Sequence, residues 1–101
     1  MDYSFSGNDA QIVIRLSGRL TLVDNAKFRG LLEEMKNRKP SSCQVDLSSL
    51  EFMDSAGLGM FVLLKKHAEQ VKCAVNLAKP AGQVKTILEL SDFHEVIDIV
   101  P

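Results

Sequence analysis

The chain has 101 residues, of which 46% are hydrophobic and 25% are charged, and this is enough for one globular domain with a modest core. Its 12 basic and 13 acidic residues leave a formal net charge of −1 at pH 7. This balance gives no reason to expect nucleic acid or an anionic membrane as the main partner.

The chain carries no targeting or membrane-spanning signal. The opening Met1–Ser4 lacks the basic and apolar regions of a signal peptide. The longest apolar run, Ala56–Leu64, is far too short to cross a bilayer. We therefore expect a cytoplasmic protein without direct membrane insertion, in which Cys43 and Cys73 are free, buried thiols.

The first part of the chain predicts a β-hairpin. Tyr3 and Phe5 alternate with serines, as in a short edge strand, and residues 7–9 have the composition of a turn. Residues 12–17 alternate between apolar and other side chains, which indicates a second strand paired with the first. Gly18 is expected to end that strand.

A helix is predicted next, from Asp24 as its cap to about Asn37. Pro40 prevents its continuation. Its apolar residues recur at the spacing of one helical face, namely Phe28, Leu31, Leu32 and Met35.

The second half alternates strands with helices. A strand is predicted over 43–48, and a helix should run from the segment that follows to about Val71. Residues 73–77 alternate again as a strand, and residues 96–100 suggest a last short one. A third helix, opened by Pro80 and broken at Ser91-Asp92, bears the apolar residues Val84, Ile87, Leu88 and Leu90.

The resulting order, β-β-α-β-α-β-α-β, predicts an α/β fold with one mixed, mostly parallel sheet and helices packed on it. In such sheets, sites gather where parallel strands end at their carboxyl edge. The loop after Ser17 and the loop at Asp54-Ser55 should both lie at that edge. We therefore expect these two loops to form one surface.

The most informative segment is Phe52–Gly59, whose sequence predicts the transition from a strand to a helix. Asp54 is a natural N-cap, because its carboxylate can accept hydrogen bonds from the first N–H groups of the helix. Ser55 follows at the helix entrance, where unpaired N–H groups and the helix dipole favour an anion. A phosphate on Ser55 would therefore be well placed.

Two glycines in the first turn, Gly57 and Gly59, each destabilise a helix by about 1 kcal/mol relative to Ala. Their presence suggests that another element or a partner approaches this turn closely. We interpret Gly57 as leaving room for a partner, and we expect Gly57→Val to weaken partner binding while the fold stays intact. Leu58 and Met60 are candidates for exposed contacts or for the core, and the sequence does not separate the two.

The run from Val45 to Gly59 resembles the signature of STAS domains, specifically of the anti-sigma factor antagonists. Gly18-Arg19-Leu20-Thr21 is similar to the Gly-x-Leu-Asp turn of that family. The resemblance implies one STAS domain over residues 1–101, with Ser55 as the phosphoacceptor and Asp54 before it. Two residues depart from the family pattern: Ala56 replaces a second Ser or Thr, and Thr21 replaces an Asp.

This resemblance implies a phosphorylation-controlled binding module of bacterial transcription regulation rather than an enzyme. The implied partners are an anti-sigma factor that is also a GHKL-type serine kinase and a PP2C-type phosphatase. No cofactor or metal is implied. The expected partner-binding residues lie in the two loops and are Thr21, Asp24, Asp54, Ser55, Ala56, Gly57, Leu58 and Gly59.

Other interpretations of Asp54-Ser55 and of the domain remain open. Asp54-Ser55 can be only a good helix start, and a STAS domain can serve another complex, such as a lipid transporter, a stress-sensing assembly or a secretion or motility switch. A catalytic Ser55 is disfavoured because His67 lies twelve residues further along the helix, roughly 18 Å away. His94 is not placed near Ser55 by any pattern, and Met53 stands where a nucleophile elbow needs Gly.

A small nucleotide-binding protein is the remaining alternative. Gly82–Thr86 ends in Lys-Thr but lacks the second glycine of a phosphate-binding loop. Asp46 and Asp54 could hold a divalent ion, but a strand end and a helix cap explain them more simply. We interpret Asp46 as structural or as a support for the loop that carries Ser55.

Overall fold

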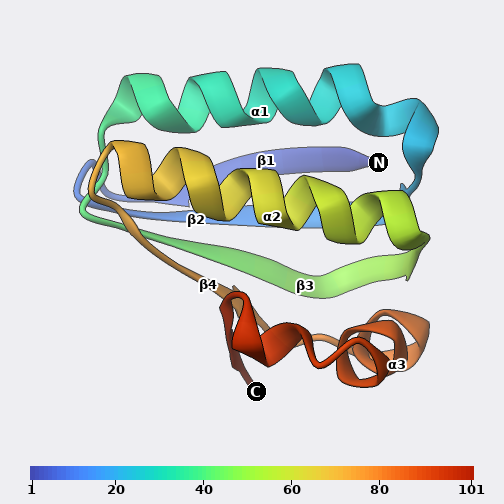
Figure 1. Ribbon diagram of the computed structural model, residues 1–101. Coiled ribbons are helices and arrows are strands. Elements are labelled where there is room, and N and C mark those ends of the chain that lie inside the picture. Colours follow the sequence, from blue (N-terminus) through green and yellow to red (C-terminus); the bar gives the residue numbers. More distant parts are fainter.

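One five-stranded sheet organises the chain, and the computed structural model describes all of residues 1–101 (Figure 1). The strands are adjacent in chain order, and α1 and α2 lie side by side over one face of the sheet. No helix has the length and apolar character needed to span a membrane. The elements are β1 Asp2–Gly7, β2 Gln11–Leu20, the 3-10 turn η1 Leu22–Asp24, α1 Asn25–Arg38, β3 Ser42–Met53, α2 Ser55–Gln70, β4 Ala74–Ala78, α3 Gly82–Leu90, the 3-10 turn η2 Phe93–Glu95 and β5 Asp98–Val100.

The predicted fold class and element order are confirmed. β1 pairs antiparallel with β2, and the strands from β2 to β5 are parallel to one another. Alternate residues of neighbouring strands, such as Ile14 beside Val45, face the helices and are buried. Helix side chains complete this core, with Phe61 of α2 between Phe28 of α1 and Phe93 of η2 at ring-centroid distances of 6.1 and 6.4 Å.

Two strands are longer than predicted. Gly18 does not end β2, which continues to Leu20 through register shifts against β3. Gly18 has a φ of +81°, a left-handed conformation that glycine adopts readily, so the strand bends here instead of stopping. β3 likewise runs to Met53 rather than ending near Ser48.

The C-terminal third also differs in detail. α3 begins at Gly82, two residues after Pro80, and Leu90 at its end is 81% exposed rather than part of the core. η2 lies between α3 and β5, where the sequence predicted neither a helix nor a strand, and β5 is confined to Asp98–Val100. α3 lies beside the carboxyl-terminal half of β3, beyond the end of β4 (Figure 1).

Asp46 is the one buried charged residue, only 5% exposed, and it lies on the sheet face opposite the core. Its carboxylate accepts hydrogen bonds from the Ser48 N–H at 2.9 Å, the Ser48 hydroxyl at 2.7 Å and the Arg15 guanidinium at 3.2 Å. Burial by itself raises the pKa of Asp46, but the Ser48 and Arg15 contacts outweigh it and the pKa lies below its ordinary value. These contacts join Asp46 of β3 to Arg15 of β2 beside the register shift between the two strands, and none of them reaches the loop of Ser55.

Both cysteines are free and buried, as the sequence predicted. Burial raises the pKa of the Cys43 thiol to about 12, with a smaller contribution from Cys73, and burial also raises the pKa of Cys73. Both thiols are therefore protonated near neutral pH and are poor nucleophiles.

The thiols should accordingly react slowly with a thiol reagent in the native protein and rapidly in denaturant. Labelling with a chromogenic disulfide, followed over time with and without urea, measures this difference. Fast labelling of the native protein, or a disulfide found by mass spectrometry without reductant, would contradict the burial of Cys43 and Cys73.

Replacing Asp46 by Asn should lower the free energy of unfolding at pH 7 by about 1–3 kcal/mol, because charge-assisted hydrogen bonds are lost inside the fold. The folded-state pKa of Asp46 lies below the unfolded value, so its stabilisation is complete above about pH 4 and is lost as the pH falls through the folded-state pKa. Urea unfolding of parent and Asp46→Asn at pH 7 and near pH 3 tests this. A stability difference as large in acid as at neutral pH would show that the carboxylate charge is not the cause.

Candidate functional site

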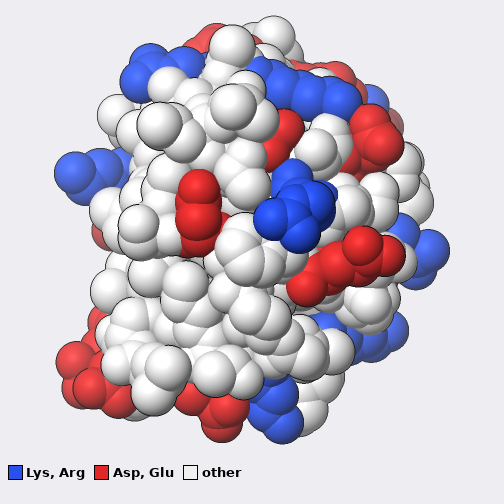
Figure 2. Space-filling view, turned by 90° about the vertical axis from the view of Figure 1, so that its right-hand side faces the viewer, with Lys and Arg blue, Asp and Glu red and all other residues white.

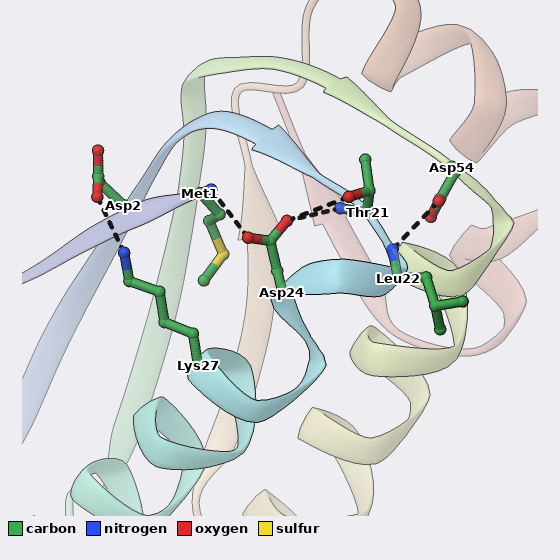
Figure 3. Close-up of polar contacts among 7 residues, drawn as sticks. All are labelled: Met1, Asp2, Thr21, Leu22, Asp24, Lys27 and Asp54. Atoms are coloured by element: carbon green, nitrogen blue, oxygen red, sulfur yellow. Dashed lines mark hydrogen bonds and ion pairs between the residues drawn. The ribbon is translucent and has the colours of Figure 1, made fainter.

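The two loops expected to share a surface do meet, at the carboxyl ends of β2 and β3. The Leu22 N–H donates a hydrogen bond to Asp54 Oδ2 at 3.2 Å (Figure 3). The Asp54 N–H in turn donates to the Leu20 carbonyl oxygen, also at 3.2 Å. The segment after β2 and the start of α2 are thereby joined at one end of the molecule.

Asp54 also caps α2. Its backbone is extended, with φ −98° and ψ −176°, and its Oδ1 accepts the Gly57 N–H at 3.1 Å. Each carboxylate oxygen therefore has its own backbone donor, one in α2 and one in η1. The sequence predicted the cap but not the bond to Leu22.

Ser55 is the first residue of α2 and is exposed. Its hydroxyl forms no hydrogen bond within the chain, and Ala56 beside it is half-buried and has no hydroxyl. Ser55 thus presents a free hydroxyl to solvent at the positive end of the helix dipole, where an attached anion is favoured.

Thr21 and Asp24 lie in the other loop, and Asp24 stands at the predicted N-cap position of α1, but its side chain makes no capping hydrogen bond to the helix. Its carboxylate turns back and accepts the Thr21 N–H at 2.9 Å, closing the η1 turn, and it contacts the Met1 ammonium at 3.1 Å (Figure 3). Burial alone raises the pKa of Asp24, but these partners outweigh it and the pKa lies below its ordinary value. Lys27 and Asp2 form a further ion pair nearby, at 3.0 Å.

The glycines of the α2 first turn have different surroundings. Gly57 is buried, and a Cβ there would lie 2.9 Å from Met53 Cε and 3.2 Å from Met53 Cβ. The close approach comes from the core of this chain, so the interpretation that Gly57 leaves room for a partner is not supported by the packing. Gly59 is exposed, with open space at its Cβ position. Leu58 is half-buried against the core, and Met60 belongs to the core.

Two exposed aliphatic residues of this end, Leu22 and Val23, were not singled out by any sequence pattern, and they are 68% and 89% exposed. A signal was available, because they are apolar, lie in a loop and match no helix or strand period. Gln83 of α3 was likewise not expected at this site; its side-chain amide accepts the Met53 N–H at 3.0 Å and donates to the Met53 carbonyl at 2.9 Å. Gln83 thereby completes the hydrogen bonding of β3 just before Asp54.

The surface around this end is mostly uncharged. Figure 2 views the molecule from the end where α2 begins, and acidic and basic side chains stand among uncharged ones singly or in small groups. No large patch of one sign covers this face, which suits contact with a protein surface better than with a polyanion.

The side chains that a catalytic Ser55 or a metal site would need are not brought together here. His67 faces charged residues of α1, and burial together with Lys36 lowers its pKa, while His94 lies in η2. Neither histidine forms a hydrogen bond with Ser55. Asp46 and Asp54 are engaged with separate partners, and no group of three or more potential metal-ligating side chains exists.

Comparisons with known proteins agree on the fold. A family model described as "Mlab, STAS domain" matches residues 3–101. A STAS-domain containing protein of Pseudomonas aeruginosa is 30% identical over 94 residues, which cover 93% of this chain and 92% of that protein.

Among solved structures, TM1081 of Thermotoga maritima superposes with a TM-score of 0.83 at 19% identity, covering 98% of this chain and 86% of that one. The Bacillus anti-sigma factor antagonist SpoIIAA in its unphosphorylated form gives a TM-score of 0.75 at 18% identity, covering 99% and 89%. Its phosphorylated form gives 0.71 at 19% identity, covering 99% and 92%. These structural likenesses show a shared fold.

Because Met53 already fills the space beside Gly57, Gly57→Val should lower the free energy of unfolding by about 1–3 kcal/mol. This reverses the expectation from sequence that the variant keeps an intact fold. Gly59→Val is the matched control, since open space surrounds that position and Val has the higher helix propensity. Urea unfolding compares the two. A Gly57→Val variant as stable as the parent would mean that Met53 moves aside freely and that the glycine serves something other than packing.

Proposed function

This chain belongs to the STAS domain family, and from that premise we propose that it is an anti-sigma factor antagonist whose binding is controlled by phosphorylation of Ser55. The observation that carries the proposal is the exposed, unbonded Ser55 hydroxyl at the start of a helix, beside a second ordered loop. The shared fold with SpoIIAA, solved with and without its phosphate, gives further support.

In the unphosphorylated state the chain binds an anti-sigma factor of the GHKL serine-kinase class, which frees the sigma factor. The contact surface consists of the exposed parts of the two loops, and Gly57 supports it from the inside by letting α2 lie close to Met53. The proposed contact residues are Thr21, Asp24, Asp54, Ser55, Ala56, Leu58 and Gly59.

The switch is electrostatic. The partner kinase transfers the γ-phosphoryl group of ATP, so that a bond forms between Ser55 Oγ and phosphorus while ADP leaves with the electrons of the broken bond and the serine proton passes to a base of the kinase. The product carries about −1.5 to −2 additional charges. In the free protein the helix start accommodates them, but inside an interface they would be desolvated next to the Asp54 carboxylate.

The magnitude of this effect is large enough for a switch. Like charges brought together at an interface cost several kcal/mol, and about 4 kcal/mol corresponds to roughly a thousandfold loss of affinity. A PP2C-type phosphatase restores the binding form by hydrolysing the ester. The chain itself catalyses neither step and serves as substrate and binding module.

A STAS subunit of another complex is the second candidate, because the matching family model is named for Mlab rather than for anti-sigma factor antagonists. The identity of the partner separates the two functions. A GHKL-type kinase as the binding partner supports the first function, and a transporter ATPase supports the second.

Ser55→Asp should fold with near-parent stability but bind the kinase about a thousandfold more weakly, because its carboxylate imitates part of the phosphate charge. Ser55→Ala should bind as the parent does and stay bound when ATP is added. Isothermal titration calorimetry measures the affinities, and mass spectrometry after incubation with kinase and ATP locates the phosphate.

The matched control is Ser6→Asp, which adds the same charge on β1, at the opposite end of the paired strands β1 and β2 from the Ser55 loop. It should bind the kinase normally. Phosphate on another residue, or Ser55→Asp binding as tightly as Ser6→Asp, would refute the switch for this protein.

A further inference from the structure

We propose that Leu22 and Val23, the Leu22–Val23 pair, form the apolar anchor by which this chain docks on its partner, an inference that rests on the proposed function. Their exposures of 68% and 89% are large for aliphatic residues, and among the other large hydrophobic residues only Leu90, at 81%, is comparable. Two such residues together in one turn are a candidate docking feature, whereas single exposed aliphatic residues are ordinary.

The pair is held in place before any partner arrives. Asp54 Oδ2 accepts the Leu22 N–H at 3.2 Å on one side. Asp24 accepts the Thr21 N–H at 2.9 Å on the other side, which closes the 3-10 turn around the pair. An ordered turn loses little conformational freedom on binding, so the apolar contact contributes more of its full value to affinity.

The Leu22–Val23 pair is also positioned by a residue adjacent to the proposed phosphorylation site. The carboxylate that accepts the Leu22 N–H belongs to Asp54, the residue directly before Ser55 (Figure 3). A partner that covers Leu22 must therefore come close to the Ser55 hydroxyl. A phosphate on Ser55 would then fall at the margin of a dry, apolar contact, where a charge is most unfavourable.

The charges beside the pair indicate the chemistry of the occupant. The Asp24 carboxylate is paired with the Met1 ammonium, but Asp54 has backbone donors only and no ion-pair partner. An anionic lipid surface would be repelled by Asp54, and membrane-binding turns usually carry basic residues beside their apolar ones. The geometry therefore fits a protein, the anti-sigma factor, that offers an apolar pocket with an uncharged rim, where a phosphate on Ser55 would find no compensating charge.

The test replaces Leu22 by Asn and Val23 by Thr in one double variant, which keeps the side-chain size while removing apolar character. Leu90→Asn is the matched control, because Leu90 is 81% exposed and lies at the far end of α3. The purified GHKL-type kinase that phosphorylates Ser55 is the probe. We expect unchanged unfolding curves for both variants, at least about a 30-fold loss of kinase affinity for the double variant and none for Leu90→Asn.

Each outcome has one meaning. Equal kinase affinity for the parent and the double variant would overturn the anchor while leaving the proposed function intact. A parent protein that binds no such kinase would overturn the proposed function and the anchor together. Binding of the parent, but not the double variant, to vesicles of phosphatidylglycerol and phosphatidylethanolamine would assign the pair to a membrane and overturn the protein occupant.

Discussion

The candidate site depends on one carboxylate that serves two elements. Asp54 Oδ1 accepts a backbone N–H of α2, and Oδ2 accepts the backbone N–H of Leu22. The first bond fixes where the helix begins and therefore where Ser55 points. The second ties that helix start to the 3-10 turn 32 residues earlier in the chain. Without this carboxylate, the two loops would be neighbours without a defined relative position.

The parallel sheet makes that bridge possible. β2 and β3 are parallel neighbours connected through α1, so both strands end at the same edge of the sheet. β2 bends at its register shifts and at Gly18, and as a result Leu20 pairs with Met53 of β3. Gln83 then binds both backbone groups of Met53, the residue directly before Asp54, beyond the point where β4 stops pairing with β3. The site is thus positioned by hydrogen-bonded strand ends rather than by a free loop.

At the end of the molecule where α2 begins, the buried residues and the exposed residues serve different purposes. Gly57 and Met60 face inward and let α2 pack closely on β3, whereas Ser55, Gly59 and the Leu22–Val23 pair face solvent. A binding module needs this division, because a change of charge at Ser55 then alters the outer surface without disturbing the core. The buried Asp46 with Arg15 and Ser48 stabilises the opposite face of the sheet and takes no part in the site.

The sequence by itself determined the features that depend on neighbours along the chain. Apolar periodicity defined α1, α2 and the alternating strands, and Asp54 before Ser55 identified the helix start, because caps act within three residues. Tertiary structure alone decided the rest. β3 reaches Met53 because β2 and Gln83 pair with it there. The Asp24 carboxylate turns toward Thr21 and Met1 instead of bonding the first N–H groups of α1, and Gly57 is required by Met53 and Leu20. The sequence marked Leu22 and Val23 only as apolar residues outside any helix or strand period, and the tertiary structure decided their exposure, because burial depends on which distant segments cover a residue.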